Sequence, residues 1–466
     1  MQLERSVTTD LPQAVVFHYL AGFHRVIEWD PSVTRAEKRT RGTVTTGTEF
    51  EVDVQFLGQT STLVYQVLEH QPPTRLVLQG KADAYTVTDT IQFETLPNGK
   101  TRLTYGLQVE YAPGYEKFAG VFAPLVRSNV DTAIAVLERT LNYQPQPVKQ
   151  YPRWRDKLVL PGMLEFTRRG YVRGKQHWAG LLFDLAGQNI VITGATSGLG
   201  RAAALALADM GANVIAVARD SNKAADLQQA VRDHCGREIR VLLGDMNSIA
   251  QTRAVAQTLL VEDQPIDVLI NNAGALFNQR DVTAEGFEKS LALLLLSPFV
   301  LTESLLPLLR KRGGRVVNVV SGGLYTQPIR LDDLHYEKGT YNGAKAYARA
   351  KRGLLDMTRR WAQQPENTGV VFHAMHPGWA DTQAVMDSLP GFYRITKPFL
   401  RDTVQGADTI VWLASAPEPT TCNGGFWLDR QLHTSAIFAN TETSPANREQ
   451  LYRMLQDLAA TVPVPN

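Results

Sequence analysis

The sequence predicts an α+β domain with an antiparallel sheet and one long helix, followed by a doubly wound α/β domain with a parallel sheet. Three observations support this fold class. Apolar and polar residues alternate along several runs within residues 1–143, which is the period of half-buried strands. One long apolar helix pattern ends that part. Short apolar runs then alternate with helical patterns through residues 187–466, as in βαβ units.

The first domain has strand patterns and a helix pattern that can be read residue by residue. The strands alternate at Phe50, Val52, Val54 and Phe56, at Tyr85, Val87, Ile91 and Phe93, and at Leu103, Tyr105, Leu107 and Val109. The turn Pro97-Asn98-Gly99 predicts a hairpin between the last two. The helix face repeats at Phe118, Phe122, Val126, Val130, Ile134, Leu137 and Leu141. A curved sheet around this helix leaves an apolar cavity, unless the apolar face packs shut.

This pattern, with Trp29-Asp-Pro-Ser-Val33 after a first helix, resembles the START/polyketide-cyclase-like (SRPBCC, helix-grip) superfamily. The resemblance implies a pocket for a hydrophobic ligand. Asp89 falls on the apolar side of its strand. We expect it at a rim open to water rather than as a polar anchor inside the pocket.

Residues 144–186 are predicted to be a basic connector. Between Lys149 and Lys175 there are eight Lys/Arg and two acids. Apolar residues flank this stretch, so peripheral membrane contact through residues 149–183 is one interpretation. Three glycines weaken a continuous helix there. This favours a linker that docks on the domains and exposes its charges to water.

The bulk composition excludes several classes of protein. A net charge of +2 argues against a nucleic-acid binder. Two cysteines, Cys235 and Cys422, form neither a disulfide framework nor a metal cluster, so we expect no metal and a reducing, cytoplasmic location. The N-terminal residues lack a signal-peptide profile, and the longest apolar run, Leu291–Leu296, is too short to span a bilayer.

A glycine-rich turn predicts the dinucleotide site. The buried strand Asn189–Ile192 runs into Thr193-Gly-Ala-Thr-Ser-Gly-Leu-Gly200 and then into a helix. Such glycines allow the backbone to approach a pyrophosphate at the helix N-terminus. The predicted cofactor contacts in this turn are the backbone of Gly194, Gly198, Leu199 and Gly200 and the hydroxyls of Thr196 and Ser197.

The end of the second strand, Asn213–Ala218, indicates which dinucleotide binds. An NAD site usually has an acid at this strand end, whereas here Ala218 is followed by Arg219. A guanidinium beside the adenine ribose favours a 2′-phosphate, so we predict NADP(H) over NAD(H). The alternative is that Arg219 is a surface residue and Asp220 binds the ribose.

Two further strand ends are predicted to reach the same crevice. Val241–Leu243 leads to Asp245 and Met246, where an acid can hold the adenine amino group. Val268–Asn271 leads to further predicted cofactor contacts at Asn272, Ala273 and Gly274.

The pair Tyr347 and Lys351 is the predicted acid/base. Residues four apart share one helix face, and an ammonium group lowers the pKa of a nearby phenol. Such a phenol can act as a general acid/base in hydride transfer at a carbonyl or alcohol carbon. A second pair, Tyr341 and Lys345, has the same spacing but lies among glycines. Tyr347 also has the better spacing to Pro377, and we favour it.

Together, TGATSGLG, NNAG, Ser321, YARAK and PGWADT resemble the short-chain dehydrogenase/reductase (SDR) family over residues 187 to about 440. The resemblance implies that Ser321 hydrogen-bonds the substrate oxygen and that Tyr347 passes the proton. Lys351 would lower the pKa of Tyr347 and hold the nicotinamide ribose. The residues that would position the nicotinamide are Pro377, Gly378 and Thr382.

One position departs from the family pattern. Leu294 stands where many members have an asparagine that links the lysine to solvent through water, and neither Ser290 nor Ser297 matches that position closely. This departure leads us to expect slow turnover or a different water relay.

Taken together, the motifs predict an NADP(H)-dependent oxidoreductase for a hydrophobic carbonyl or alcohol. The alternative is a lipid-type carrier with a redox-sensing, weakly catalytic nucleotide domain. Family resemblance also allows a homo-oligomer.

Overall fold

The computed structural model describes residues 1–56, 58–115, 119–151, 164–381, 386, 390–438 and 441–463. The chain divides into two compact units. The first consists of Met1–Pro145 with Val172–Leu182 and Arg232–Gly236. The second consists of Gln146–Tyr171, Phe183–Val231 and Arg237–Asn466. Each unit has its own sheet.

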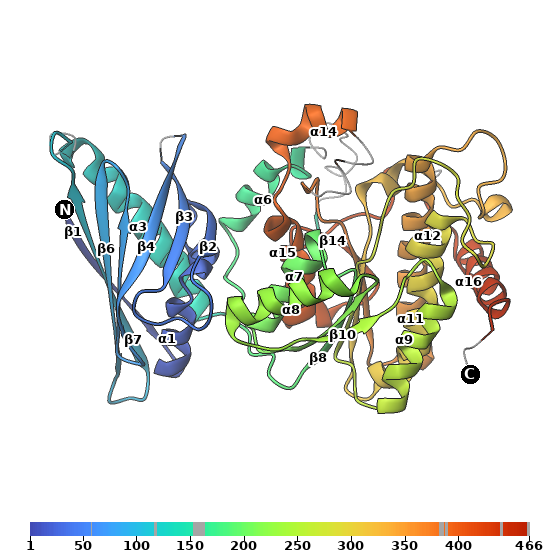
Figure 1. Ribbon diagram of the computed structural model, residues 1–466, viewed down its shortest axis with the longest axis horizontal. Helices are drawn as coiled ribbons and strands as arrows, with labels where there is room; N and C mark the ends of the chain where they lie inside the picture. Colours follow the sequence, from blue (N-terminus) through green and yellow to red (C-terminus); the bar gives the residue numbers. More distant parts are fainter. Residues whose placement is uncertain are drawn as a thin grey trace. The chain divides into compact units, whose positions relative to one another are not determined.

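The first unit is a seven-stranded antiparallel sheet with a long helix (Figure 1). The strand order is β1-β7-β6-β5-β4-β3-β2. The elements are β1 (Gln2–Thr9), α1 (Gln13–Ala21), α2 (Val26–Trp29), β2 (Val33–Lys38), β3 (Glu49–Phe56), β4 (Gln59–Gln71), β5 (Arg75–Lys81), β6 (Tyr85–Thr95), β7 (Thr101–Tyr111) and α3 (Ala119–Leu141). The predicted α+β helix-grip class is confirmed.

The three predicted strands form, and the helix forms from Ala119 onward, while Phe118 lies outside the described residues. Gly99 has a φ of 81° in the turn between β6 and β7, a conformation that favours glycine. The C-terminal half of α3 buries Ile134, Leu137 and Leu141 against the sheet. Its N-terminal half is packed less completely, because Val126 is only partly buried.

The prediction for Asp89 was wrong. Only 1% of the residue is exposed, and its Oδ1 accepts a hydrogen bond of 2.9 Å from the hydroxyl of Tyr105. Burial raises the pKa of Asp89 to about 7. The alternation of β6 correctly predicted that this carboxyl lies on the inner face of the sheet. It did not show the hydrogen bond from Tyr105 on β7, which allows the carboxyl to be buried there.

The second unit is an eight-stranded sheet with the order β10-β9-β8-β11-β12-β13-β14-β15, parallel except for the last pair. Its strands are β8 (Asn189–Thr193), β9 (Asn213–Ala218), β10 (Arg240–Leu243), β11 (Val268–Asn271), β12 (Arg315–Val319), β13 (Val371–Met375), β14 (Gly425–Leu428) and β15 (Gln431–Leu432). Its α-helices are α6 (Arg168–Lys175, which continues into the first unit), α7 (Gly198–Asp209), α8 (Ser221–Cys235), α9 (Ile249–Glu262), α10 (Lys289–Leu291), α11 (Ser297–Arg310), α12 (Gly343–Gln363), α14 (Pro390–Thr396), α15 (Thr403–Ser415) and α16 (Pro445–Ala460).

Helices cover both faces of this sheet (Figure 1). Helices α7 and α15 pack against each other and against the sheet, while α11 and α12 pack against β11, β12 and β13. This arrangement confirms the doubly wound α/β class. It also brings the C-terminal ends of the parallel strands to one edge, where ligands bind in such folds.

One helical stretch, Lys289–Arg310, is long and apolar enough to cross a membrane by length and composition. Of its most apolar window, 83% is buried inside the structure, and its leucines belong to the core of the second unit. It is therefore a core helix of the second unit.

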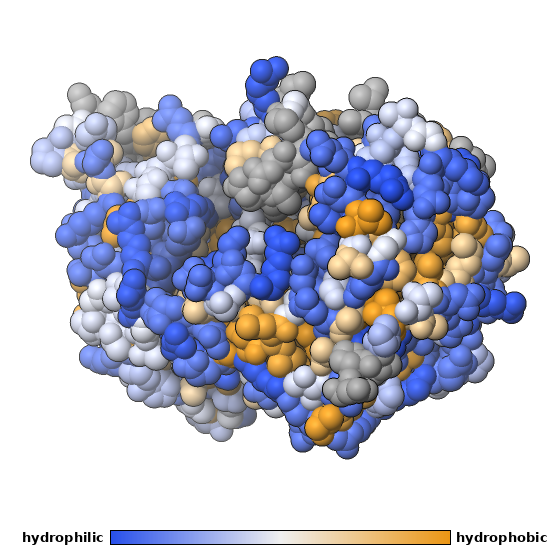
Figure 2. Space-filling view, turned by 45° about the vertical axis from the view of Figure 1, so that its right-hand side comes forward, coloured by the Kyte–Doolittle hydropathy of each residue, from blue (hydrophilic) through white to orange (hydrophobic). Residues whose placement is uncertain are grey.

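The face drawn in Figure 2 is mainly hydrophilic, with apolar residues in separate patches. Scattered apolar residues of this kind are ordinary on protein surfaces.

The predicted connector, residues 144–186, is shared between the two units. Residues 152–163, which carry part of its basic charge, lie outside the described residues. The segment Leu164–Tyr171 belongs to the second unit, where Trp379 donates a backbone hydrogen bond of 2.7 Å to Phe166. This part of the connector is docked on the second unit.

Candidate active site

A cleft of about 580 Å³ lies at the C-terminal edge of the parallel sheet. This volume is within the usual range for a small-molecule site. Nearly all the residues predicted for cofactor and catalysis line it. They are Gly194, Thr196, Ser197, Gly198, Leu199, Arg219, Asp245, Met246, Asn272, Ala273, Gly274, Ser321, Tyr347, Lys351, Pro377 and Gly378. Thr382 lies outside the described residues.

The glycine-rich turn is held by the neighbouring strand end. A Cβ on Gly194 would lie 2.8 Å from Cα of Ala273, and one on Gly200 would lie 2.3 Å from the carbonyl oxygen of Gly194. Gly200 does not line the cleft; it allows α7 to approach the turn closely. Asn272 donates from its amide to the carbonyl oxygens of Thr193 and Gly194, at 3.0 and 3.1 Å. Its side chain thus shapes the turn.

The adenine end of the cleft contains two cations and two acids. Arg219 is exposed and lines the cleft, and so does Lys223, which the sequence reasoning missed. Asp220 also lines it, but its Oδ1 accepts hydrogen bonds from the backbone of Asn222 and Lys223, at 2.9 and 3.1 Å. This carboxylate therefore caps the start of α8. Asp245 similarly accepts two hydrogen bonds of 2.9 Å from Asn247.

Tyr347 and Lys351 lie on one face of α12, with the ammonium nitrogen 5.9 Å from the centre of the phenol ring. Ser321 follows the end of β12 and hydrogen-bonds Tyr347, which lowers the pKa of the phenol. Burial has the larger effect and raises that pKa to about 12. Burial and Ser321 account for the direction of this pKa, and the lowering by Lys351 that the family resemblance implies stays a prediction.

Lys351 is itself deeply buried, with only 2% of the residue exposed. Burial lowers its own pKa to about 7, so much of its charge is lost near neutral pH. Its Nζ donates a hydrogen bond of 2.6 Å to the carbonyl oxygen of Val319.

Tyr341 is engaged elsewhere. Its hydroxyl donates to Oε1 of Glu288 at 2.9 Å, and the residue lies before the start of α12. Among the described residues that line the cleft, Tyr347 is present and Tyr341 is not. The geometry agrees with the choice of Tyr347.

Leu294 is fully buried in a π-helical turn, Ala292–Leu296. A Cβ on Gly274 would lie 3.3 Å from Leu294 Cδ2 and 3.7 Å from Lys351 Nζ, so both side chains border Gly274. Ser290 hydrogen-bonds Tyr341 at 3.3 Å and Ser297 hydrogen-bonds Thr252 at 3.0 Å. Both serines are thus engaged away from Lys351.

A buried arginine supports the Pro377-Gly378 turn, and the sequence reasoning missed it. Arg401, 1% exposed, donates two hydrogen bonds to Asp429 at 2.6 and 2.8 Å. It also donates to the carbonyl oxygens of Glu165, at 2.6 Å, and Thr167, at 3.2 Å. Gly378 has a φ of 76°, and a Cβ there would lie 2.4 Å from Arg401 Nε. The arginine thus ties the turn to the connector segment.

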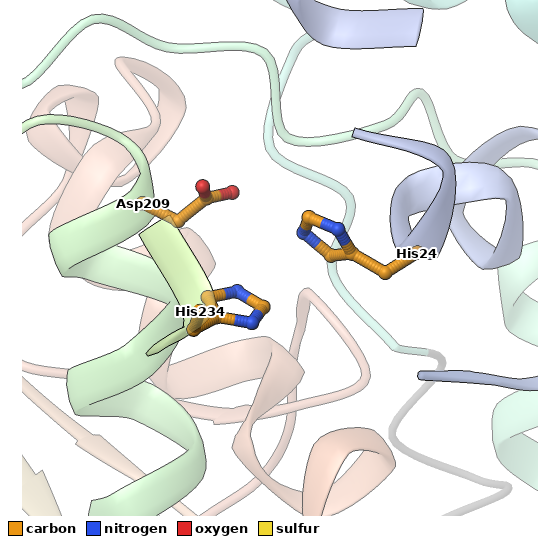
Figure 3. Close-up of side chains that lie close together, drawn as sticks. All are labelled: His24, Asp209 and His234. Atoms are coloured by element: carbon orange, nitrogen blue, oxygen red, sulfur yellow. The ribbon is translucent and has the colours of Figure 1, made fainter. Parts of the chain in front are cut away.

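Figure 3 labels three further side chains with metal-ligand chemistry, His24, Asp209 and His234. They are divided between the two units of the chain. A metal site needs its ligands in one fixed frame. We therefore assign no metal to them.

The fold and this cleft define a dinucleotide-dependent oxidoreductase, and the chain belongs to the short-chain dehydrogenase/reductase family. The family model for short chain dehydrogenases matches residues 188–391. A second model, for polyketide cyclase / dehydrase and lipid transport, matches residues 1–142. These matches confirm both sequence-based resemblances.

A human relative supports the assignment to the short-chain dehydrogenase/reductase family. Human dehydrogenase/reductase SDR family member 12 is 35% identical over 306 residues, which are 64% of this chain and 96% of that protein. Human retinol dehydrogenase 14 is 35% identical over 266 residues, which are 52% of this chain and 78% of that protein. A solved structure of an uncharacterised protein from Mycobacterium paratuberculosis is 26% identical, with a TM-score of 0.49, and covers 59% of this chain and 95% of that one.

Proposed function

We propose that the second unit is an NADP(H)-dependent oxidoreductase for a hydrophobic carbonyl or alcohol. The observation that carries this proposal is that Ser321, Tyr347 and Lys351 line the same cleft as the glycine-rich turn. A bound nicotinamide supplies or accepts the hydride. The residues of the chain bind, orient and handle the proton.

In this proposal, Ser321 and Tyr347 both hydrogen-bond the reacting oxygen of the substrate. A phenol whose pKa is about 12 is protonated at neutral pH, so it is ready to give a proton to an oxygen that gains negative charge. It is a weak base for removing a proton from an alcohol.

The preference for NADP(H) is supported by the charges at the adenine end. Arg219 and Lys223 offer two cations to a 2′-phosphate, whereas the carboxylate of Asp220 is used in capping α8. The fit of a pyrophosphate is supported by Gly194, Gly198 and Leu199, which line the cleft at the start of α7.

A hydrophobic substrate is supported by the apolar lining of the cleft, which includes Leu276, Leu293 and Trp379. The human relative named retinol dehydrogenase 14 suggests an apolar alcohol or aldehyde as the first candidate. The test is NADPH consumption by the full chain with a panel of apolar aldehydes and ketones that includes retinaldehyde. Consumption with none of them above the rate without substrate would contradict the proposal.

For the first unit, we propose that it binds a hydrophobic ligand. Support comes from its family match and from the apolar face of α3, where Val126 is only partly buried. Native mass spectrometry of the full chain should detect a retained apolar ligand. Val126→Glu should reduce that ligand, and Arg127→Glu at the next, exposed position should not. Equal ligand retention in both variants would contradict the proposal.

A second candidate function is a ligand carrier whose nucleotide domain turns over slowly. The observation that favours it is Leu294, an apolar side chain that borders Gly274 as Lys351 does, at the position where the family pattern often has a polar residue. The two functions differ in a single-turnover experiment. Rapid oxidation of bound NADPH on mixing with an apolar carbonyl favours the enzyme, and unchanged NADPH favours the carrier.

A further inference from the structure

Two buried histidines lie at the C-terminal end of β13, and they differ in their partners. His373 is 1% exposed and His376 is 3% exposed. Positions three apart on an extended chain face opposite sides of the sheet. The pair therefore offers a comparison between two similar side chains in one segment.

The ring of His373 is satisfied on both nitrogens. Nε2 lies 2.9 Å from the carbonyl oxygen of Pro419, and Nδ1 accepts a hydrogen bond of 3.3 Å from the backbone of Gly425. One nitrogen is a donor and the other an acceptor, as a neutral imidazole requires. His373 is a structural residue.

His376 lines the cleft, and neither of its ring nitrogens has a hydrogen-bond partner among the described residues. A Cβ on Gly322, the residue after Ser321, would lie 2.8 Å from Nε2 of this ring. The ring of Phe166 meets it edge-on, with centres 4.6 Å apart. The imidazole is therefore fixed by packing beside Gly322, one position after the serine that would bind the substrate oxygen.

The charge state of His376 follows from its neighbours. Burial, then the nearby positive charges of Arg401 and His433, lower its pKa to about 3. The ring is neutral at physiological pH and carries one donor and one acceptor. A buried polar group without partners is costly, so native proteins keep one mainly where a ligand or water satisfies it.

We propose that His376 is a ligand-recognition residue that hydrogen-bonds an uncharged carbonyl, carboxamide or hydroxyl group inside the cleft. This inference rests on the proposed function, because the group belongs to a ligand of the reductase site. Two sources share this chemistry. One is the carboxamide of the nicotinamide, and the other is a second oxygen on the substrate.

The experiment uses the full chain with His376→Leu, His376→Asn and, as the matched control, His373→Leu. NADPH binding is measured by the change in its fluorescence, and stability by thermal melting. The Michaelis constant is measured for acetophenone and for 2-hydroxyacetophenone, which adds a second oxygen. His373→Leu should lower the melting temperature, because it leaves partners of the ring unpaired.

His376→Leu should leave the melting temperature unchanged or raised, because it removes an unsatisfied buried group. If the partner is the carboxamide, the dissociation constant for NADPH should rise about 10-fold, which corresponds to about 1.4 kcal/mol. If the partner is a substrate oxygen, the dissociation constant for NADPH should stay constant. The Michaelis constant for 2-hydroxyacetophenone, which should be lower than that for acetophenone in the wild type, should rise to the value for acetophenone. His376→Asn, which keeps a donor and an acceptor, should recover part of either loss.

Two results would overturn the inference. One is unchanged binding of NADPH and of both ketones in His376→Leu. The other is a loss of binding that comes with a fall in melting temperature like that of His373→Leu, which would mark His376 as structural. Wild-type protein that binds no NADPH would instead refute the proposed function itself.

Discussion

The buried pair Arg401 and Asp429 allows a prediction whose size can be worked out from the structure. The Arg401 side chain is 1% exposed and that of Asp429 is 11% exposed, and two hydrogen bonds join them. Asp429→Ala removes the only carboxylate that the structure shows bonded to this guanidinium within the described residues. Breaking such a buried pair costs about 3–5 kcal/mol, because the remaining charge stays buried.

The second unit has about 300 residues, so at about 2.1 cal/mol/K per residue each kcal/mol changes its melting temperature by roughly 1.5 °C, and Asp429→Ala should lower it by at least about 4 °C. The control is Glu262→Ala, which breaks an ion pair with Arg240 whose side chains are 41% and 33% exposed. An exposed pair contributes about 0–1 kcal/mol. NADPH binding should weaken in Asp429→Ala only, because Arg401 packs against Gly378.

The assay is thermal melting of the full chain with and without NADPH, together with titration of NADPH fluorescence. Equal changes in melting temperature for Asp429→Ala and Glu262→Ala would refute the reasoning about burial. A large loss of stability with normal NADPH affinity would refute the role of Arg401 in supporting the cofactor turn.

Three further predictions test the cofactor site. Arg219→Asp should shift cofactor preference from NADPH toward NADH, measured as the ratio of dissociation constants, and an unchanged ratio would count against a 2′-phosphate site. Gly200→Ala should abolish NADPH binding because its Cβ meets the carbonyl oxygen of Gly194 at 2.3 Å, whereas Gly391→Ala, which meets no atom within 4 Å, should bind normally. Burial lowers the pKa of Lys351 to about 7 in the folded state, from about 10.4 in the unfolded chain. Between these pH values the unfolded chain binds more protons, so the free energy of unfolding should rise with pH by up to about 1.4 kcal/mol per pH unit. A Lys351→Met variant whose stability has the same pH slope between pH 7 and 9 in thermal melting would contradict this.

The sequence was sufficient to predict the fold of both units and most of the cleft lining. The glycine turn, Arg219 and Ser321 are all tied to the end of a strand, and the ends of parallel strands meet at one edge of the sheet. Local patterns are therefore enough to bring such residues together. The helix spacing of Tyr347 and Lys351 is equally local.

Residues whose role depends on distant partners could not be predicted. Arg401 contacts Glu165 and Asp429, which are 236 and 28 positions away, and no local pattern marks these contacts. The pKa of Tyr347 also depends on burial, which spacing does not report. His376 did carry a signal, since it is a polar residue at the end of an apolar strand, directly before Pro377-Gly378. The same reasoning that selected Ser321 would have found it.

The central claim is that the hydroxyl of Tyr347 transfers the proton while the rest of the cleft binds the cofactor. Tyr347→Phe removes one oxygen atom and leaves the glycine turn and Lys351 in place. We predict that NADPH binds to this variant with unchanged affinity, while its turnover with the best carbonyl of the panel falls by at least about 100-fold, the usual contribution of a general acid. Turnover within a few-fold of the wild-type rate, with NADPH bound normally, would contradict the account.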